Sequence, residues 1–329
     1  MESFKPPIGL ASPYTQTIIS SSSMRTFGRR RWMGDSQQSI ELLPDNVRLE
    51  CFYSPPPIST THHSSLFILL HGWEGSAHSS YIVHMTDVLL KAGFHVLRYN
   101  MRDHGNTHHL NEGVFYGTLL KENIDLIKLW ANRFPDFNIY LIGFSLGGNF
   151  TLRILNSINI QKVPNLKSGF VMNPALDPKR STIKIDQIGV LKWYFLKKWK
   201  ISLRKKMAAF PNLYQFQKFL NIDSCMGLTE ILLKYYSEFS DCQSYFNTYT
   251  IKIGHYSPQI PVKIITAKDD PIIEQELFDT PPTDSKAEII VLPKGGHCGY
   301  ISNYKLESWY HRYILDSVTG HSFLLPEYE

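Results

Sequence analysis

Short apolar runs that alternate with longer amphipathic stretches dominate the hydrophobic pattern of this chain. Residues 66–70 (LFILL) are continuously apolar between polar loops, a pattern that favours a strand buried on both faces of a sheet. Other apolar runs are interpreted in the same way, and a hairpin is predicted around Pro44, Asp45 and Asn46. The predicted strands are residues 39–43, 47–53, 66–70, 95–99, 139–142, 168–172, 262–266 and 287–292.

Helical periodicity separates these strands. Residues 81–91 and 122–134 repeat their apolar positions at helical spacing, with Gly93 as a C-cap after the first and Pro135 ending the second. A last helix is predicted for residues 304–318. Strands that alternate with helices predict an α/β fold with a mostly parallel central sheet and helices on both faces. Ligands of such sheets collect at the carboxyl ends of the strands.

The pattern changes between Pro174 and about Gln259, where the chain is helical and rich in aromatic residues and no strand is predicted. We interpret residues 175–259 as a helical cap inserted into a core made of residues 39–174 and 260–329. Residues 1–38 are expected to form an irregular N-terminal segment. A cap of this kind would cover the mouth of a site at the strand ends and shape its pocket.

One part of the predicted cap interleaves basic and aromatic residues, and we call it the basic-aromatic segment. Such a combination can contact a membrane surface, but a solvated helix face with the aromatic side chains packed inward is the alternative that we favour. A run of arginines at Arg29, Arg30 and Arg31 is expected to be solvated charge. The segment comprises Lys192, Trp193, Tyr194, Phe195, Leu196, Lys197, Lys198, Trp199, Lys200, Arg204, Lys205 and Lys206.

Composition argues against several classes of protein. A hydrophobic content of 43% and a charged content of 19% are those of a globular chain, and 329 residues suffice for one α/β domain with an insertion or for two domains. A net charge of +5, without a zinc-finger, RRM or KH motif, argues against nucleic acid as a partner.

Cysteine usage and the lack of export signals predict a soluble, cytoplasmic protein. Cys51, Cys225, Cys242 and Cys298 form no CxxC pair, so neither a disulfide framework nor a metal site is expected. The opening MESFKPPIGL carries an acid and two prolines where a secretory signal needs a basic start and an apolar stretch. No run approaches the ~18 apolar residues of a membrane-spanning helix.

The motif GFSLG at residues 143–147 carries the strongest chemical signal. An apolar run leads into it and a helical pattern follows, which is the layout of a nucleophile elbow: strand, tight turn and helix. Glycines on both sides of the turn let the helix pass close to the strand. Ser145 would then stand at a helix N-terminus, where free backbone N–H groups favour an oxyanion.

A second motif, HGWEGS, follows directly after residues 66–70. An HG step at the end of a buried strand is a position from which the next backbone N–H can bind an oxyanion. We therefore predict an oxyanion hole made of the N–H groups of Trp73 and Leu146. An ordinary strand-to-helix loop with a turn glycine is the alternative.

Two late loops can complete a catalytic triad in the chain order serine, acid, histidine. His297 lies in a glycine-rich loop after the last predicted strand, and Asp269 and Asp270 follow residues 262–266. We choose Asp270 because an apolar step follows it, and Asp269 stays open. A serine hydroxyl is a weak nucleophile until an imidazole accepts its proton and a carboxylate holds that imidazole in one tautomer.

Histidine pairs and triplets could suggest a metal site, but they lack Cys, Asp or Glu at ligand spacing, and Asp103 alone does not repair this. Neither a metal nor another cofactor is expected. The histidines concerned are His62, His63, His104, His108 and His109.

Five segments in order resemble the YheT-like branch of the α/β-hydrolase superfamily, which also includes the ABHD-type lipases. They are PPIGLASPYTQTI, HGWEGS, GFSLGGN, AKDDP and GGHCGY. The resemblance implies a serine esterase or lipase that cleaves carboxylic esters without a cofactor. Its triad would be Ser145, Asp270 and His297, with the Trp73 and Leu146 amides as the oxyanion hole.

The chain departs from that branch at Tyr14, where a histidine is common, in the MRDHGN loop, and after Pro174. The substrate is therefore expected only as a small-molecule or lipid ester of unspecified acyl length. A thioesterase or an acyltransferase could use the same machinery. A non-catalytic lipid-binding or partner-binding protein with this fold is the alternative from another class.

Overall fold

The computed structural model of this chain describes residues 4–26, 33, 35–57 and 63–320. The described residues form a sheet with the strand order β1-β2-β4-β3-β5-β6-β7-β8. β2 pairs antiparallel with β1 and β4, whereas all pairings from β4 to β8 are parallel, so the predicted mostly parallel sheet is confirmed. The strands are β1 (Gln37–Leu42), β2 (Arg48–Ser54), β3 (Ser65–Leu70), β4 (His95–Asn100), β5 (Asn138–Phe144), β6 (Leu166–Met172), β7 (Val262–Ala267) and β8 (Ala287–Leu292).

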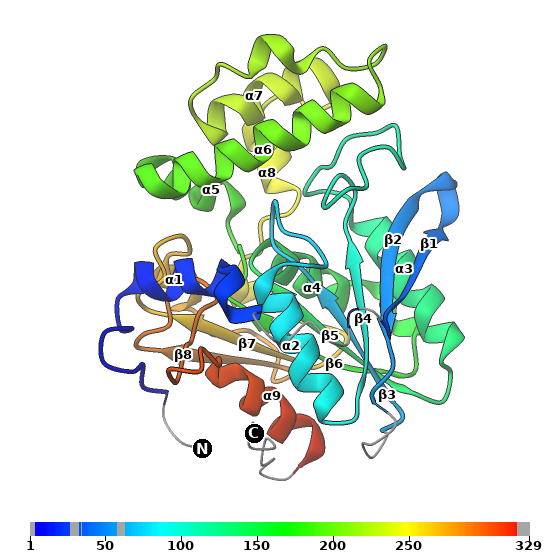
Figure 1. The fold of residues 1–329 in the computed structure, drawn as a ribbon, viewed down its shortest axis with the longest axis vertical. Helices are drawn as coiled ribbons and strands as arrows, with labels where there is room; N and C mark the ends of the chain where they lie inside the picture. Colours follow the sequence, from blue (N-terminus) through cyan, green and yellow to red (C-terminus); the bar gives the residue numbers. More distant parts are fainter. Residues whose placement is uncertain (1–3, 27–32, 34, 58–62, 321–329) are drawn as a thin grey trace.

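Helices cover both faces of this sheet, as the alternating pattern predicts (Figure 1). One buried apolar cluster joins the sheet to α3 and α4, and a second joins the opposite face to α2 and α9. The α-helices are α1 (Pro13–Ser21), α2 (Ser80–Lys91), α3 (Leu120–Arg133), α4 (Leu146–Asn156), α5 (Pro178–Gln187), α6 (Gly189–Ala209), α7 (Cys225–Tyr236), α8 (Cys242–Asn247) and α9 (Trp309–Thr319).

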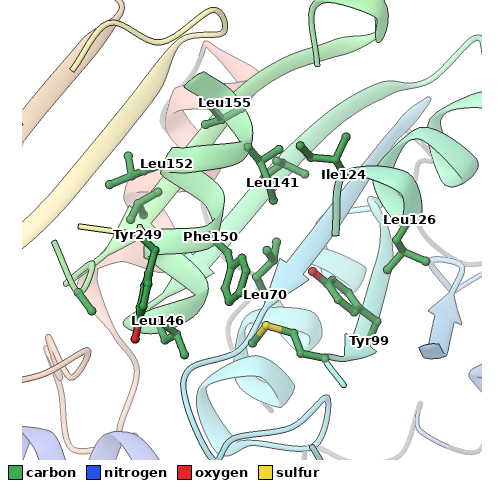
Figure 2. Packing of buried hydrophobic residues seen from close by; sticks show 14 of the residues in the cluster. Leu70, Tyr99, Ile124, Leu126, Leu141, Leu146, Phe150, Leu152, Leu155 and Tyr249 are labelled. Carbon is green, nitrogen blue, oxygen red and sulfur yellow. The ribbon is translucent and has the colours of Figure 1, made fainter. Parts of the chain in front are cut away.

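The packing of α4 against the sheet fixes the turn that precedes this helix. Figure 2 shows Phe150 of α4 beside Leu70 of β3, and Leu146 and Leu152 of α4 belong to the same buried cluster as Leu70 and Leu141 of β5. Burying each such side chain stabilises the fold by roughly 1.5–3 kcal/mol relative to leaving it exposed. The end of β5 and the start of α4 are therefore held on one rigid support.

The segment between β6 and β7 is helical and contributes α5 to α8, which lie beyond one end of the sheet in Figure 1. One side chain of α4 forms hydrogen bonds with both connections between this insertion and the core. Asn149 Nδ2 donates to the carbonyl oxygens of Ala175, 2.8 Å away, and of Tyr249, also 2.8 Å away. The entry and the exit of the insertion thus meet at the helix that follows Ser145.

The expectation of an irregular N-terminal segment is wrong for part of that segment. Pro13 starts α1, and β1 begins at Gln37, whereas the arginine run at 29–31 lies outside the described residues. The sequence shows little amphipathic periodicity in α1, because polar rather than apolar side chains make its buried contacts. Gln16, Thr17 and Ser20 are the residues of α1 that are buried.

The final helix also begins later than predicted, at Trp309 instead of residue 304. Leu306 has a φ of 60°, and Ile301 forms an isolated antiparallel bridge with Ser308, so the chain turns back on itself before the helix starts.

None of the helices in the described ranges has the length and hydrophobicity needed to cross a membrane.

Candidate active site

Ser145 occupies a strained turn between β5 and α4. Its φ of 52° and ψ of −116° are unusual for a residue with a side chain, and strain of this kind persists where the surroundings enforce it. The Ser145 N–H donates to the carbonyl oxygen of Met172 at 3.0 Å. A Cβ atom on Gly147 would overlap the carbonyl oxygens of Leu70 and His71, so only glycine fits there. The geometry is that of the predicted elbow.

His297 meets Ser145 from the loop after β8. Its Nε2 lies 2.9 Å from Ser145 Oγ, and its Nδ1 lies 2.8 Å from Asp270 Oδ2. Because a carboxylate oxygen only accepts, Nδ1 carries the proton and Nε2 accepts from the serine hydroxyl. The structure therefore brings all three predicted side chains into one hydrogen-bonded chain.

Asp270, not Asp269, is the carboxylate that contacts His297. The Asp270 side chain is 0% exposed, and its Oδ1 accepts from the N–H groups of Ile272 at 2.8 Å and Ile273 at 3.1 Å. Asp269 Oδ1 instead accepts from the Gly296 N–H at 2.9 Å, and burial raises the pKa of Asp269. The two neighbouring acids therefore have different positions and different partners.

Asn173 connects the acid loop to the histidine loop, and sequence reasoning missed this role. Its Nδ2 donates to Asp270 Oδ2 at 2.6 Å, and its Oδ1 accepts from the Cys298 N–H at 3.1 Å and from the Tyr300 hydroxyl at 2.8 Å. Asn173 also has a positive φ of 44°. Its place directly after the predicted strand 168–172 was the available signal.

The N-terminal helix α1 holds the backbone of the histidine loop, which was not predicted from the residues either. The His297 N–H donates to Thr17 Oγ1 at 2.9 Å, and Ser20 Oγ donates to the His297 carbonyl oxygen at 3.3 Å. Gln16 Oε1 accepts from the Ile301 N–H at 2.7 Å. The Gln-Thr pair in the opening segment of the resemblance was the only sequence signal.

The two amides predicted to form an oxyanion hole lie beside Ser145. Leu146 is the first residue of α4, so its N–H has no partner within the helix. Gly72 lies close to Ser145, because a Cβ on Gly72 would be 3.3 Å from the Ser145 Cβ. The Gly72 N–H donates to the Tyr81 hydroxyl at 2.9 Å, and this hydrogen bond positions the peptide that leads to Trp73. Within the described ranges, neither the Trp73 N–H nor the Leu146 N–H donates a hydrogen bond to a protein acceptor.

Two hollows meet at Ser145. A largely apolar cavity of about 140 Å³ extends from it beneath α5 to α8, and a wider groove of about 700 Å³ reaches Ser145 and His297 between α1 and α6. An apolar chain fits the first, whereas the second is open to a larger group. The cavity lining includes Trp73, Phe115, Leu146, Phe195, Leu232 and Phe246.

The basic-aromatic segment lies in α6, and its side chains divide between the cavity wall and the surface. Phe195 stacks on Trp73 with ring centroids 5.3 Å apart, and Trp199 meets the same ring edge-on at 5.0 Å, whereas Trp193 is 60% exposed. Lys206 corrects the expectation of a solvated basic face. It is 1% exposed and binds Asp103 Oδ1 at 2.9 Å.

Two of the histidines considered for a metal site, His104 and His108, are buried. Burial lowers the pKa of His104 to about 4 and that of His108 to about 3. His62 lies outside the described residues. Among the described residues, no three His, Cys, Asp or Glu side chains gather in a way that could hold a metal ion.

A mostly parallel sheet with an elbow serine after β5, and with acid and histidine loops after β7 and β8, defines an α/β hydrolase. The family model described as serine aminopeptidase, S33, matches residues 61–298, which is more than half of the chain. The chain belongs to this family.

Similarities to known proteins agree with the family. "Putative esterase YheT" of Escherichia coli (strain K12) is 22% identical over 328 residues, covering 96% of this chain and 93% of that protein. This similarity confirms the resemblance found in the five motifs. The Pyrococcus furiosus esterase Pf2001 has the same fold, with a TM-score of 0.54, 16% identity, and coverage of 98% of this chain and 99% of that one. A serine hydrolase of Cycloclasticus zankles, CCSP0084, aligns with a TM-score of 0.55 at 14% identity, covering 87% of this chain and 98% of the other.

Proposed function

We propose that this protein is a serine hydrolase that cleaves carboxylic esters through an acyl intermediate on Ser145. The observation that carries the proposal is the continuous hydrogen-bonded chain from Ser145 Oγ to His297 Nε2 at 2.9 Å and from His297 Nδ1 to Asp270 Oδ2 at 2.8 Å. This is the arrangement that activates a serine hydroxyl at neutral pH.

In the first half-reaction, His297 Nε2 accepts the Ser145 proton as Oγ attacks the ester carbonyl carbon. Asp270 keeps the imidazole in the required tautomer and stabilises the imidazolium. The imidazolium then protonates the leaving alcohol, and the acyl group remains on Ser145. In the second half-reaction, His297 deprotonates a water molecule that attacks the acyl carbon, which releases the acid and restores the serine.

The charge that develops on the carbonyl oxygen needs donors that already point at it. The N–H groups of Trp73 and Leu146 fit this task because both border Ser145 and both lack a described protein acceptor. Preorganised donors of this kind lower a barrier by about 3–4 kcal/mol each in acyl transfer. The positive end of α4 adds to the same effect.

The cavity and the groove suggest how an ester is divided between them. The largely apolar cavity suits the acyl chain, and the wider groove between α1 and α6 suits the alcohol portion and its departure. An ester with an extended apolar acyl chain, including one derived from a lipid, is therefore the substrate class that we favour. A reducing compartment such as the cytoplasm fits the four cysteines, none of which is in a disulfide.

A direct test combines active-site labelling with turnover. Wild-type protein should react with a fluorophosphonate probe and hydrolyse p-nitrophenyl esters from acetyl to palmitoyl, whereas Ser145→Ala should lose labelling and at least about 10⁴-fold in kcat. Product analysis with water and added alcohols as competing acceptors separates hydrolysis from acyl transfer. Wild-type protein that neither labels nor turns over any ester would overturn the proposal.

A further inference from the structure

Trp73 and Glu74 occupy the corner of a tight turn beside Ser145, and this turn carries one of the two proposed oxyanion donors. The Gly75 N–H donates to the Gly72 carbonyl oxygen at 3.0 Å, which closes the turn across Trp73 and Glu74. Glu74 has a φ of 54°, so the chain reverses sharply at this residue. The Trp73 N–H can point at an oxyanion only while the turn keeps this conformation.

The direction of the Trp73 N–H is set by the carbonyl group of the preceding residue. A peptide group is planar and its N–H points opposite to its C=O, so the donors that bind the Gly72 oxygen also orient the Trp73 N–H. That oxygen accepts from the Gly75 N–H at 3.0 Å and from His71 Nδ1 at 2.8 Å. His71 Nε2 accepts from the Met101 N–H at 3.2 Å, which leaves the ring proton on Nδ1.

A lysine of the insertion between β6 and β7 binds the same turn. Lys198 of α6 donates from Nζ to the Glu74 backbone carbonyl oxygen at 2.6 Å. The Glu74 C=O and the Gly75 N–H belong to one planar peptide, so the ammonium group orients the N–H that closes the turn. Charge-assisted hydrogen bonds are stronger than neutral ones, and consecutive hydrogen bonds polarise one another. The ammonium group therefore acts through two peptides on the Trp73 N–H.

Aromatic rings of α6 hold the Trp73 side chain next to this contact. The Phe195 ring stacks on the Trp73 ring with an interplanar angle of 7°, and Trp199 packs edge-on against the same ring. Phe195 and Trp199 also line the cavity proposed for the acyl chain. Residues three and four apart lie on one face of a helix, so Lys198 shares this face with Phe195. The position of α6 therefore affects both the cavity wall and the turn.

We propose that Lys198 is a positioning residue for the oxyanion hole, so that the insertion contributes to the chemical step and not only to binding of the acyl chain. This inference rests on the proposed ester hydrolysis and adds a residue to it. Lys198 acts through the turn: its Nζ fixes the peptide after Glu74, and that peptide fixes the Trp73 N–H. As charge develops on the ester carbonyl oxygen, the N–H is already directed at it.

A transition-state analogue measures the oxyanion hole directly. When an alkyl trifluoromethyl ketone binds, Ser145 Oγ adds to the ketone carbon, His297 takes the serine proton, and the ketone oxygen becomes an alkoxide. The matched trifluoromethyl alcohol has the same alkyl chain but cannot form this adduct. Lys198 also borders the groove proposed for the alcohol portion of an ester. Neither compound has that portion, so contact between Lys198 and a leaving group does not enter the comparison.

Lys198→Met keeps an extended side chain but removes the charge and the donors. We expect kcat for a short p-nitrophenyl ester to fall about tenfold with KM within about twofold of wild type, because both half-reactions pass through an oxyanion. Ki of the trifluoromethyl ketone should rise about tenfold, whereas Ki of the matched alcohol should not change. Lys198→Arg keeps a charged donor and should restore most of the kcat and of the ketone affinity.

Lys192→Met in the same helix is the matched control. It removes a surface ion pair with Asp223, and such pairs contribute little, so kcat and both Ki values should stay at those of wild type. Lys198→Gln is a second uncharged variant, which keeps the test available if Lys198→Met does not fold. It should change the same two quantities, kcat and the ketone Ki, in the same direction.

A ketone Ki within about twofold of wild type in the uncharged variants of Lys198 would overturn the inference. Equal increases in the Ki values of the ketone and the alcohol would also overturn it, since they would reflect a displaced insertion and not an altered oxyanion hole. Fluorophosphonate labelling carried to completion shows that Ser145 is reactive in each variant. Wild-type protein that neither labels nor hydrolyses an ester would instead overturn the proposed ester hydrolysis, and this inference with it.

Discussion

Asp270 shows how the site is organised at the scale of single residues. Its two carboxylate oxygens accept from His297, Asn173, Ile272 and Ile273, and its side chain is fully buried. Charge-assisted hydrogen bonds are stronger than neutral ones, so four of them fix the direction of the carboxylate. The orientation of His297 over Ser145 depends on that direction.

Separate substitution of the two adjacent acids tests this assignment. Asp270→Asn should lower kcat by about 10⁴-fold, because an amide at this position favours the wrong tautomer of His297. Asp269→Asn should stay within about tenfold of wild type, since an amide oxygen can still accept from the Gly296 N–H. The measurement is kcat for a short p-nitrophenyl ester with both purified variants. Loss of turnover only in Asp269→Asn would contradict the assignment.

His104 leads to a prediction about pH. Its pKa is about 4 in the folded protein against an ordinary value of 6.5, so between these values the unfolded chain binds the extra proton. Stability contributed by the neutral ring is therefore present above about pH 6.5 and is lost as the pH falls toward 4, at up to about 1.4 kcal/mol per pH unit.

Urea denaturation at about pH 7 and pH 5 measures this loss. The free energy of unfolding should decrease between about pH 7 and pH 5 in both proteins. The decrease should be about 2 kcal/mol smaller in His104→Asn than in wild type, because asparagine does not titrate and can still donate to the Arg102 carbonyl. His109→Asn, at an exposed position, is the control and should behave like wild type. Equal falls in His104→Asn and wild type would refute the prediction.

At the scale of elements, α1 and α6 contribute contacts that the core does not provide. α1 binds the backbone N–H and carbonyl of His297 through Thr17 and Ser20. α6 inserts Lys206 into the loop after β4, where its Nζ binds Asp103 and the carbonyl oxygens of Asn111, at 2.6 Å, and Gly113, at 2.9 Å. One helix therefore positions the histidine, and the other anchors the insertion over the cavity.

The role of α1 can be tested at Thr17. Thr17→Val keeps the shape of the side chain but removes the acceptor of the His297 N–H, so we expect kcat to fall about tenfold, the equivalent of one buried hydrogen bond, with little change in KM. Thr17→Ser should restore turnover, because serine offers the same acceptor. The rate of fluorophosphonate labelling reports the same change at Ser145.

Thr15→Val in the same helix is the matched control, and it should retain wild-type kcat. A purely structural role of Thr17 would lower thermal stability in Thr17→Val without changing the kcat of the folded fraction. That outcome would remove α1 from the positioning of His297.

At the scale of the whole molecule, the groove to Ser145 opens between α1 and α6, and exposed apolar residues border it. Ile18 of α1 is 55% exposed, and Val190 and Trp193 of α6 are 52% and 60% exposed. Lys197 Nζ lies 4.9 Å above the Trp193 ring centroid. Exposed apolar and basic side chains at the mouth of a site suit contact with an anionic lipid surface.

Vesicle partitioning tests this contact. Reversing the charge at Lys197, Lys200 and Arg204 together should weaken binding to anionic phosphatidylserine vesicles by at least about tenfold, because each basic group near such a surface contributes about 1 kcal/mol. Lys206 is left in place because it is buried. Reversal of the exposed Lys5, Lys167 and Lys286 is the matched control. Unchanged partitioning of the first variant would exclude contact through α6.

The sequence by itself determined the sheet, the elbow and the order of the site residues. Continuous apolar runs such as residues 66–70 can be buried only inside a sheet covered on both faces, and β3 is buried along its length. Gly147 faces carbonyl oxygens that leave no room for a side chain, so the motif around Ser145 follows from local sterics. Local patterns of this kind depend on near neighbours in the chain and can be recognised without the fold.

Only the tertiary structure decided which polar side chains meet. Asn173 lies 97 residues from Asp270, and Thr17 lies 280 residues from His297, so no local pattern marks either contact. The structure also placed Lys206 in the interior, although its neighbours suggested a solvated face. A hydrogen bond depends on positions and directions to within tenths of an ångström, and only the packing of the complete sheet and its helices brings these distant groups to such positions.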